Sequence, residues 1–165
     1  MSSTPRLGVP LLSAGQAQKE MYHNEALQTL DTLVAAAVEQ TALNTPPTSP
    51  VSGACYIVGS APTGAWAGKA QSIAAFTSAG WRFVTPFEGL AVYVKSTGTW
   101  AAYRAGAWEV GQVRGSSLIF GGLQIVGSRA GAIASASGGT TVDAQARSVI
   151  DQILTAMRQH GLIES

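Results

Sequence analysis

Tryptophan is the residue type in this chain with the clearest capacity for ligand chemistry. Of the twelve Phe, Trp and Tyr residues, eleven lie between Tyr56 and Phe120. Each tryptophan follows a glycine by one or two positions, which predicts a turn before the ring and the start of a strand at it. A ring placed there can bury one face and offer the other to the C–H face of a sugar. The predicted carbohydrate-binding residues are Trp66, Trp81, Trp100, Trp108 and Tyr103.

The same aromatic residues have a second interpretation as the core of a small β module. Phe, Tyr and Trp carry large apolar areas, and small domains often depend on them for burial. Trp100 and Tyr103 are three positions apart, an odd number, so on one strand they point to opposite faces. The sequence therefore does not allow all five rings to serve a single site, and it leaves both interpretations open.

Catalytic and metal-binding patterns are sparse. His23 and His160 both fall on predicted helices, and neither has a second His or a Cys at metal-ligand spacing. Glu88 and Glu109 are the only carboxylates between residues 40 and 140, and a glycosidase pair would need them ~5–9 Å apart. Phosphate-binding and nucleophile-elbow motifs are absent from the sequence. We expect no enzymatic activity, no metal and no cofactor, with a polysaccharide-degrading enzyme as the weaker alternative.

Two helices are predicted to flank the aromatic region. The first spans residues 13–43, with Ser13 and Gln16 as a capping box, and Pro46 and Pro47 end it. The second spans residues 141–160, capped by Thr140, with an apolar face and with Gly161 in the left-handed position after its end.

Short strands joined by tight turns are predicted between the helices, as an antiparallel meander or small barrel. The predicted strands are 56–58, 73–77, 81–85, 90–95, 100–104 and 108–110. Residues 112–139 are rich in Gly and Ser, and they are either strands packed against neighbouring copies or a flexible linker. The predicted class is therefore α+β, with segments 1–50, 51–111, 112–140 and 141–165. The only cysteine, Cys55, is expected to be a buried strand residue.

Charge is scarce and unevenly distributed. Charged residues make up 12% of the 165 residues, against about 25% in an average domain, and ten Lys+Arg against nine Asp+Glu leave +1. Residues 40–140 carry 6 − 2 = +4 and the remainder 4 − 7 = −3. The low charge argues against a nucleic-acid partner, and no apolar stretch reaches the ~20 residues of a membrane span. A surface this poor in charge predicts a homo-oligomer whose uncharged surface is covered by partners.

Several motifs carry a family resemblance over roughly residues 6–110. They are the N-terminal blocks Arg6–Leu12, Gly15–Glu20 and His23–Leu27, and the later blocks Tyr56–Gly59, Gly64–Gly68 and Trp81–Phe83 with Pro86 and Gly89. The chain resembles an uncharacterised family of phage and prophage structural proteins of alphaproteobacteria that includes head-spike proteins of gene transfer agents. Cys55 departs from the polar residue expected before the Tyr56 strand.

The resemblance implies a virion component: a head spike or tail fibre subunit, made in the bacterial cytoplasm without a signal peptide, that attaches to host capsular polysaccharide. It favours a homotrimer, with an extended N-terminal leader and the first helix contacting capsid or tail proteins. Two alternatives remain open. One is a structural adaptor or decoration protein that binds no glycan, and the other is the enzyme with Glu88 and Glu109 as its acids.

Overall fold

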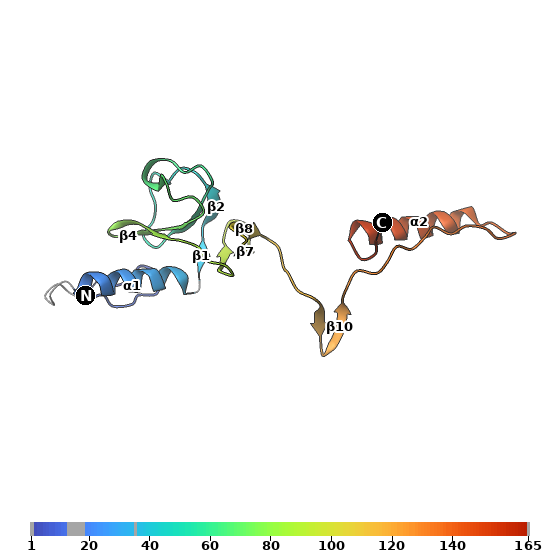
Figure 1. The fold of residues 1–165 in the computed structure, drawn as a ribbon, viewed down its shortest axis with the longest axis horizontal. Helices are drawn as coiled ribbons and strands as arrows, with labels where there is room; N and C mark the ends of the chain where they lie inside the picture. Colours follow the sequence, from blue (N-terminus) through green and yellow to red (C-terminus); the bar gives the residue numbers. More distant parts are fainter. Residues whose placement is uncertain (1, 13–18, 35, 165) are drawn as a thin grey trace. The chain divides into compact units, whose positions relative to one another are not determined.

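The computed structural model describes residues 2–12, 19–34 and 36–164 (Figure 1). It has the α+β fold class predicted from the sequence, with antiparallel-rich small sheets between an N-terminal and a C-terminal helix. The chain divides into two compact units, which we call unit 1 (Met1–Gln112) and unit 2 (Val113–Ser165).

Unit 1 contains two four-stranded sheets. Sheet 1 has the order β1 (Ala37–Val38), β6 (Ala91–Val94), β7 (Thr99–Arg104) and β8 (Ala107–Val110). Sheet 2 has the order β2 (Gln40–Leu43), β3 (Cys55–Val58), β4 (Ile73–Thr77) and β5 (Gly80–Val84). β1 pairs in parallel with β6 and β2 in parallel with β3, whereas the other pairs are antiparallel. The six predicted strands all occur, and no strand end differs from its predicted position by more than one residue.

The prediction of one helix over residues 13–43 is wrong at its C-terminal end. Helix α1 spans Lys19–Leu33, and residues 37–43 form β1 and β2. Val38 is buried between the sheets, and each short strand gains its hydrogen bonds from a sheet that is distant in sequence. The predicted capping box at Ser13 and Gln16 lies outside the described residues. Because residues 37–43 supply a strand to each sheet, the N-terminal segment is not separate from the β module.

Two hydrophobic cores lie on opposite faces of sheet 2. The main core fills the space between the sheets and includes Val38, Ile57 and Val92, with Leu33 of α1 packed against it. The second core contains Val58, Trp66 and Ala74 on the other face. Trp66 belongs to η1 (Gly64–Trp66), a 3-10 turn in the connection between β3 and β4 that covers this face. The central strands of sheet 2, β3 and β4, are therefore covered on both faces.

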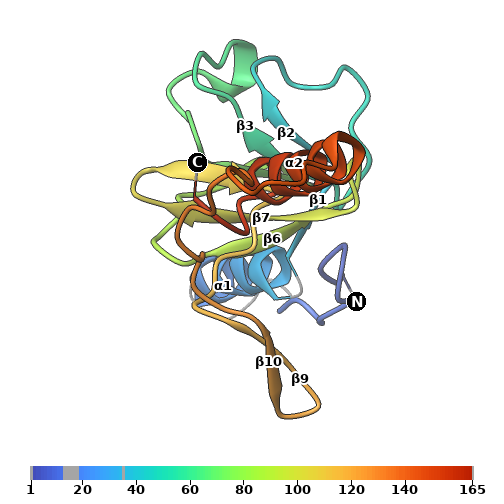
Figure 2. The ribbon, with the colours of Figure 1, turned by 90° about the vertical axis from the view of Figure 1, so that its right-hand side faces the viewer.

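The N-terminal leader, residues 2–12, is folded back rather than extended as the sequence suggested. Thr4 and Val9 are joined by a backbone hydrogen bond of 2.9 Å, and Ser3 and Pro10 form an antiparallel bridge. The leader is attached to α1 through Asp31, which is 2% exposed. Its carboxylate accepts hydrogen bonds from the Thr4 hydroxyl at 2.8 Å and from the backbone N–H groups of Arg6 and Leu7 at 3.0 and 2.6 Å. In Figures 1 and 2, α1 lies below the strands of unit 1.

Unit 2 contains a hairpin, β9 (Leu118–Phe120) with β10 (Leu123–Val126), and helix α2 (Ala144–Gln159). The N-cap of α2 is Asp143, whose carboxylate accepts from the Ala146 N–H at 2.9 Å, so the prediction of Thr140 as the cap is wrong. The predicted end of α2 is confirmed. Gly161 has φ 69°, and Leu162 donates to the Met157 carbonyl in the pattern of a Schellman cap.

Candidate functional site

The outer face of sheet 1 carries an exposed aromatic pair. Tyr93 of β6 and Trp100 of β7 are directly opposite in the antiparallel register, so their side chains share one face. Their ring centroids are 5.7 Å apart at an interplanar angle of 71°. Trp100 is 59% exposed and Tyr93 37% exposed, whereas their sequence neighbours Val92, Val94 and Ala101 point into the main core. The pair therefore presents an aromatic surface held by a buried sheet.

Ion pairs flank this aromatic surface, one just past the ends of β1 and β6 and the other between β7 and β8. The Lys95 ammonium lies 2.6 Å from the Glu39 carboxylate, and the Arg104 guanidinium lies 3.7 Å from the Glu109 carboxylate. Both pairs remain partly exposed, so they add donors and acceptors beside the rings and contribute little to stability. An aromatic face with polar groups at its margin has the composition of a surface that packs on a sugar ring and hydrogen-bonds its hydroxyls.

Trp66 and Trp81 are brought together, but inside the protein. Trp66 is fully buried, and it lies in η1 instead of at the start of a strand, so the prediction of a turn-edge ring is wrong at this position. The Trp81 ring is partly buried, with centroids 5.0 Å from Trp66 and 4.9 Å from Phe76. Because these rings pack edge to face on one another, their surface is used within the second core.

Trp108 and Tyr103 form a third group on the inner side of sheet 1. Their ring centroids are 5.4 Å apart, and both pack against the main core. The indole N–H of Trp108 donates to the Gln71 carbonyl at 2.8 Å and so links β8 to the connection before β4. The prediction that Trp100 and Tyr103 face opposite ways is confirmed, since Trp100 lies on the outer face and Tyr103 on the inner one.

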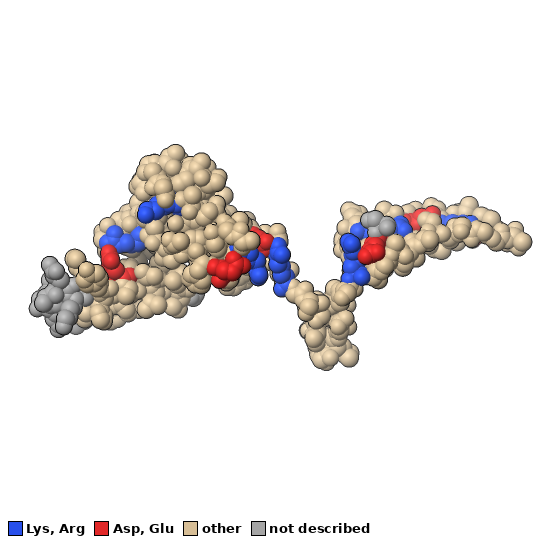
Figure 3. Space-filling model, viewed as in Figure 1, with Lys and Arg blue, Asp and Glu red and all other residues tan. Residues whose placement is uncertain are grey.

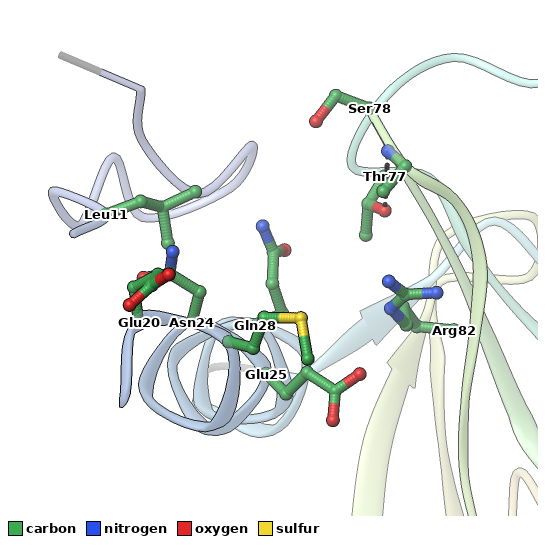
Figure 4. A pocket seen from close by; sticks show the side chains of 10 residues that line it. Leu11, Glu20, Asn24, Glu25, Gln28, Thr77, Ser78 and Arg82 are labelled. Atoms are coloured by element: carbon green, nitrogen blue, oxygen red, sulfur yellow. Dashed lines mark hydrogen bonds between the residues drawn. The ribbon is translucent and has the colours of Figure 1, made fainter. Parts of the chain in front are cut away.

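A groove lined by both polar and apolar side chains runs between α1 and β5, which is an edge strand of sheet 2 (Figure 4). It consists of a cavity of about 280 Å³ near Leu11 and an adjoining one of about 210 Å³ near Thr32. Glu25, Gln28 and Arg82 line both cavities. Asn24 positions the leader at one end, because its side-chain amide exchanges two hydrogen bonds with the Leu12 backbone, at 2.9 and 3.0 Å.

The other residues considered for chemistry are structural or solvent-facing. Burial raises the pKa of the Cys55 thiol to about 11, an effect larger than the opposing one of the Arg6 charge, so the thiol is protonated near neutral pH. This confirms the prediction of a buried strand cysteine. His23 and His160 are both exposed. Within the described ranges, no three His, Cys, Asp or Glu side chains are grouped as a metal site would need.

Glu88 and Glu109, the alternative catalytic pair, each have a local structural contact. The Glu88 carboxylate accepts from the Ala105 backbone N–H at 2.9 Å and fixes the turn between β7 and β8. Glu109 is the partner of Arg104. The expectation of no enzymatic activity stays a prediction.

Sequence reasoning missed two parts of these surfaces. Tyr93 was not among the predicted residues, although its alternation with Val92 and Val94 is a signal that it lies on the outer face. The groove had no such signal, because it joins helix residues to Arg82 across more than fifty positions. In the described part of the chain, no helix is long and apolar enough to cross a membrane.

The fold and surfaces define a small α+β domain with an exposed aromatic face and without a recognisable catalytic centre among the described residues. Residues 23–109 match the model of the family described as "Protein of unknown function (DUF2793)". The match covers more than half of the chain and ends before unit 2, and the chain belongs to this family. A comparison with curated proteins gives no match.

Proposed function

We propose that this protein is a virion spike or fibre subunit that uses the Tyr93–Trp100 face to bind host-surface polysaccharide. The resemblance of residues 6–110 to phage and gene-transfer-agent structural proteins supports the class of protein. The observation that carries the binding role is the exposed T-shaped aromatic pair on a rigid sheet, flanked by the ion pairs of Lys95 and Arg104. The other four predicted rings have their surfaces wholly or partly occupied by protein contacts.

The proposal includes self-association through unit 2, with a homotrimer as the favoured form. Val113–Ser165 has only Leu154 and Ile163 as buried hydrophobic residues among those described, which is too small a core for an independent domain. The register of the hairpin, with its bulge, places four large apolar side chains on one face: Leu118, Phe120, Leu123 and Val126. All four are 46% exposed or more.

The hairpin also lacks the devices that keep strand edges from pairing. Residues 115–128 contain no charged residue and no proline, and Figure 3 shows β9 and β10 without charge. An isolated two-stranded hairpin is marginal in water, so an uncharged apolar face of this kind is best stabilised by neighbouring copies. A symmetric spike or fibre supplies such copies.

Binding of the full-length protein to purified capsular polysaccharide of its host, on a biosensor surface, tests the glycan role. We expect Trp100→Ala to weaken binding about fivefold or more, because a stacked aromatic contributes on the order of 1 kcal/mol or more. Phe87→Ala is the matched control, since Phe87 is an aromatic of similar exposure (55%) outside sheet 1. Unchanged binding by Trp100→Ala, with near-ultraviolet circular dichroism preserved, contradicts the proposal.

A structural adaptor without glycan affinity is the second candidate. It is favoured by the same apolar hairpin, which serves particle assembly equally well. Normal particle assembly together with absent glycan binding by the unmodified protein would support this alternative.

A further inference from the structure

The groove between α1 and β5 has two buried polar atoms that no described residue partners. Glu20 Oε2 and Gln28 Oε1 are buried, and neither accepts a hydrogen bond from any described residue. Both atoms belong to residues that line the 280 Å³ cavity. Buried acceptors normally have a donor, so a ligand in this cavity that donates hydrogen bonds would satisfy both atoms.

Two charged residues at the margin of the same groove, Glu25 and Arg82, are exposed and so accessible to a ligand. Within residues 2–12, 19–34 and 36–164, neither the Arg82 guanidinium nor the Glu25 carboxylate has an ion-pair partner. Figure 4 shows Arg82 reaching from β5 toward Gln28, with Glu25 below it. The groove therefore offers hydrogen-bond acceptors along α1 and the guanidinium donors of Arg82 from β5, on facing walls.

The size of the groove suits a short chain of small polar units. Its two cavities, of about 280 and 210 Å³, adjoin at Glu25, Gln28 and Arg82. Together they fall within the ~300–1,000 Å³ typical of small-molecule sites. Ser78 adds a hydroxyl group at the wall opposite the helix, and Met21 adds an apolar surface. The Thr77 hydroxyl also borders this wall, but it already donates to the Gly80 carbonyl and accepts from the Ala79 N–H.

The charge of the lining selects among polar ligands. Two carboxylates, from Glu20 and Glu25, face one guanidinium, so an anionic ligand meets net repulsion. Sugar hydroxyls both donate and accept, which satisfies the orphan acceptors of α1 and the donors of Arg82 together. A protonated amino group would gain further from the carboxylates.

An extended peptide pairing with the free edge of β5 is the competing occupant. Strand addition would satisfy backbone groups of β5, but it gives no reason for the buried acceptors on the helix, which need several closely spaced donors. The side-chain chemistry of the groove thus favours a saccharide.

We propose that the α1–β5 groove is a second saccharide site, which takes a neutral or amino-sugar oligosaccharide and discriminates against uronic-acid polymers. This inference rests on the proposed glycan-binding function but uses residues other than the Tyr93–Trp100 face. The two sites would contact different parts of one polysaccharide or two different surface glycans, and their variants separate them.

Calorimetric titration of the full-length protein with three trisaccharides tests the groove. The probes are a glucosamine trisaccharide, maltotriose and trigalacturonic acid. We expect the first two to bind at least about tenfold more tightly than the third, and Arg82→Ala and Gln28→Ala each to weaken this binding about tenfold. Lys69→Ala is the matched control, because it removes a cation that lies over the Phe83 ring and does not line either cavity.

Each outcome decides between the two sites. If trisaccharide binding persists in Trp100→Ala and is lost in Arg82→Ala, the groove proposal is supported, whatever polysaccharide binding shows for the Tyr93–Trp100 face. Binding lost only in Trp100→Ala assigns saccharides to sheet 1 alone and overturns the groove proposal. The proposal is also overturned if no trisaccharide binds at 20-fold molar excess and millimolar protein concentrations, or if an extended peptide library binds through Arg82 instead.

Discussion

The attachment of the leader to Asp31 gives a prediction whose magnitude follows from the structure. In Asp31→Asn, the side-chain oxygen can still accept from Thr4 and Leu7, which both bond to Oδ1 in the native protein. The new amide then faces the Arg6 N–H, a donor that bonded to Oδ2 at 3.0 Å. One charge-assisted hydrogen bond is lost, two become neutral, and a donor is left facing a donor. A hydrogen bond to a charged group contributes about 1.5–3 kcal/mol, so we expect the free energy of unfolding to fall by about 3 kcal/mol.

Urea unfolding followed by tryptophan fluorescence measures this change in unit 1, since all four tryptophans lie in Met1–Gln112. The control is Glu25→Gln, which also replaces a carboxylate by its amide, at an exposed position of α1 in the same unit, and should shift the stability of unit 1 by less than about 0.5 kcal/mol. A double-mutant cycle with Thr4→Val should show coupling of about 1 kcal/mol or more, because the Thr4 hydroxyl donates directly to the carboxylate. If Asp31→Asn lowers the free energy of unfolding by less than about 0.5 kcal/mol, the hydrogen bonds of Asp31 do not hold the leader on α1 and the reasoning is refuted.

Two further predictions concern the buried thiol and the hairpin. Cys55 has its pKa raised by burial from 9.0 to about 11, so the unfolded chain releases this proton first as pH rises. The free energy of unfolding should therefore fall by roughly 2–3 kcal/mol between pH 9 and 11. In a plot of urea midpoint against pH, Cys55→Ala should flatten this part of the curve. An unchanged slope in Cys55→Ala contradicts the assignment. For the hairpin, Phe120→Lys should lower the solution mass measured by light scattering to that of a smaller species, while Gln124→Lys on the opposite face should leave it unchanged. A monomeric native protein, or equal effects of the two variants, would count against self-association through this face.

Local sequence signals were sufficient where the structure depends on nearby residues. Gly80, Gly98 and Gly106 all have positive φ and mark turns between strands that the alternation of apolar residues had already located. The end of α2 at Gly161 was predictable for the same reason, because a left-handed residue after a helix favours glycine. The α+β class follows from these short-range preferences.

Local signals failed where distant contacts decided the conformation. Residues 37–43 continue a helical apolar pattern, but pairing with β6 and β3 buries Val38 and overrides that preference. The sequence predicted the start of α2 three residues too early. Thr140 and Asp143 are both good N-cap residues, and only the folded geometry shows that Asp143 accepts the hydrogen bond from the Ala146 N–H.

The candidate sites divide in the same way. The sequence by itself determined that aromatic rings concentrate in one β module, that Trp100 and Tyr103 face opposite ways, and that the hairpin region lacks charge. Only the tertiary structure decided which ring is available, because the exposure of a tryptophan depends on what packs over it. The 3-10 turn folds Trp66 onto sheet 2, whereas no described residue of unit 1 covers Trp100 to the same extent. The groove was likewise decided by tertiary packing, which brings Gln28 of α1 to face Arg82 of β5.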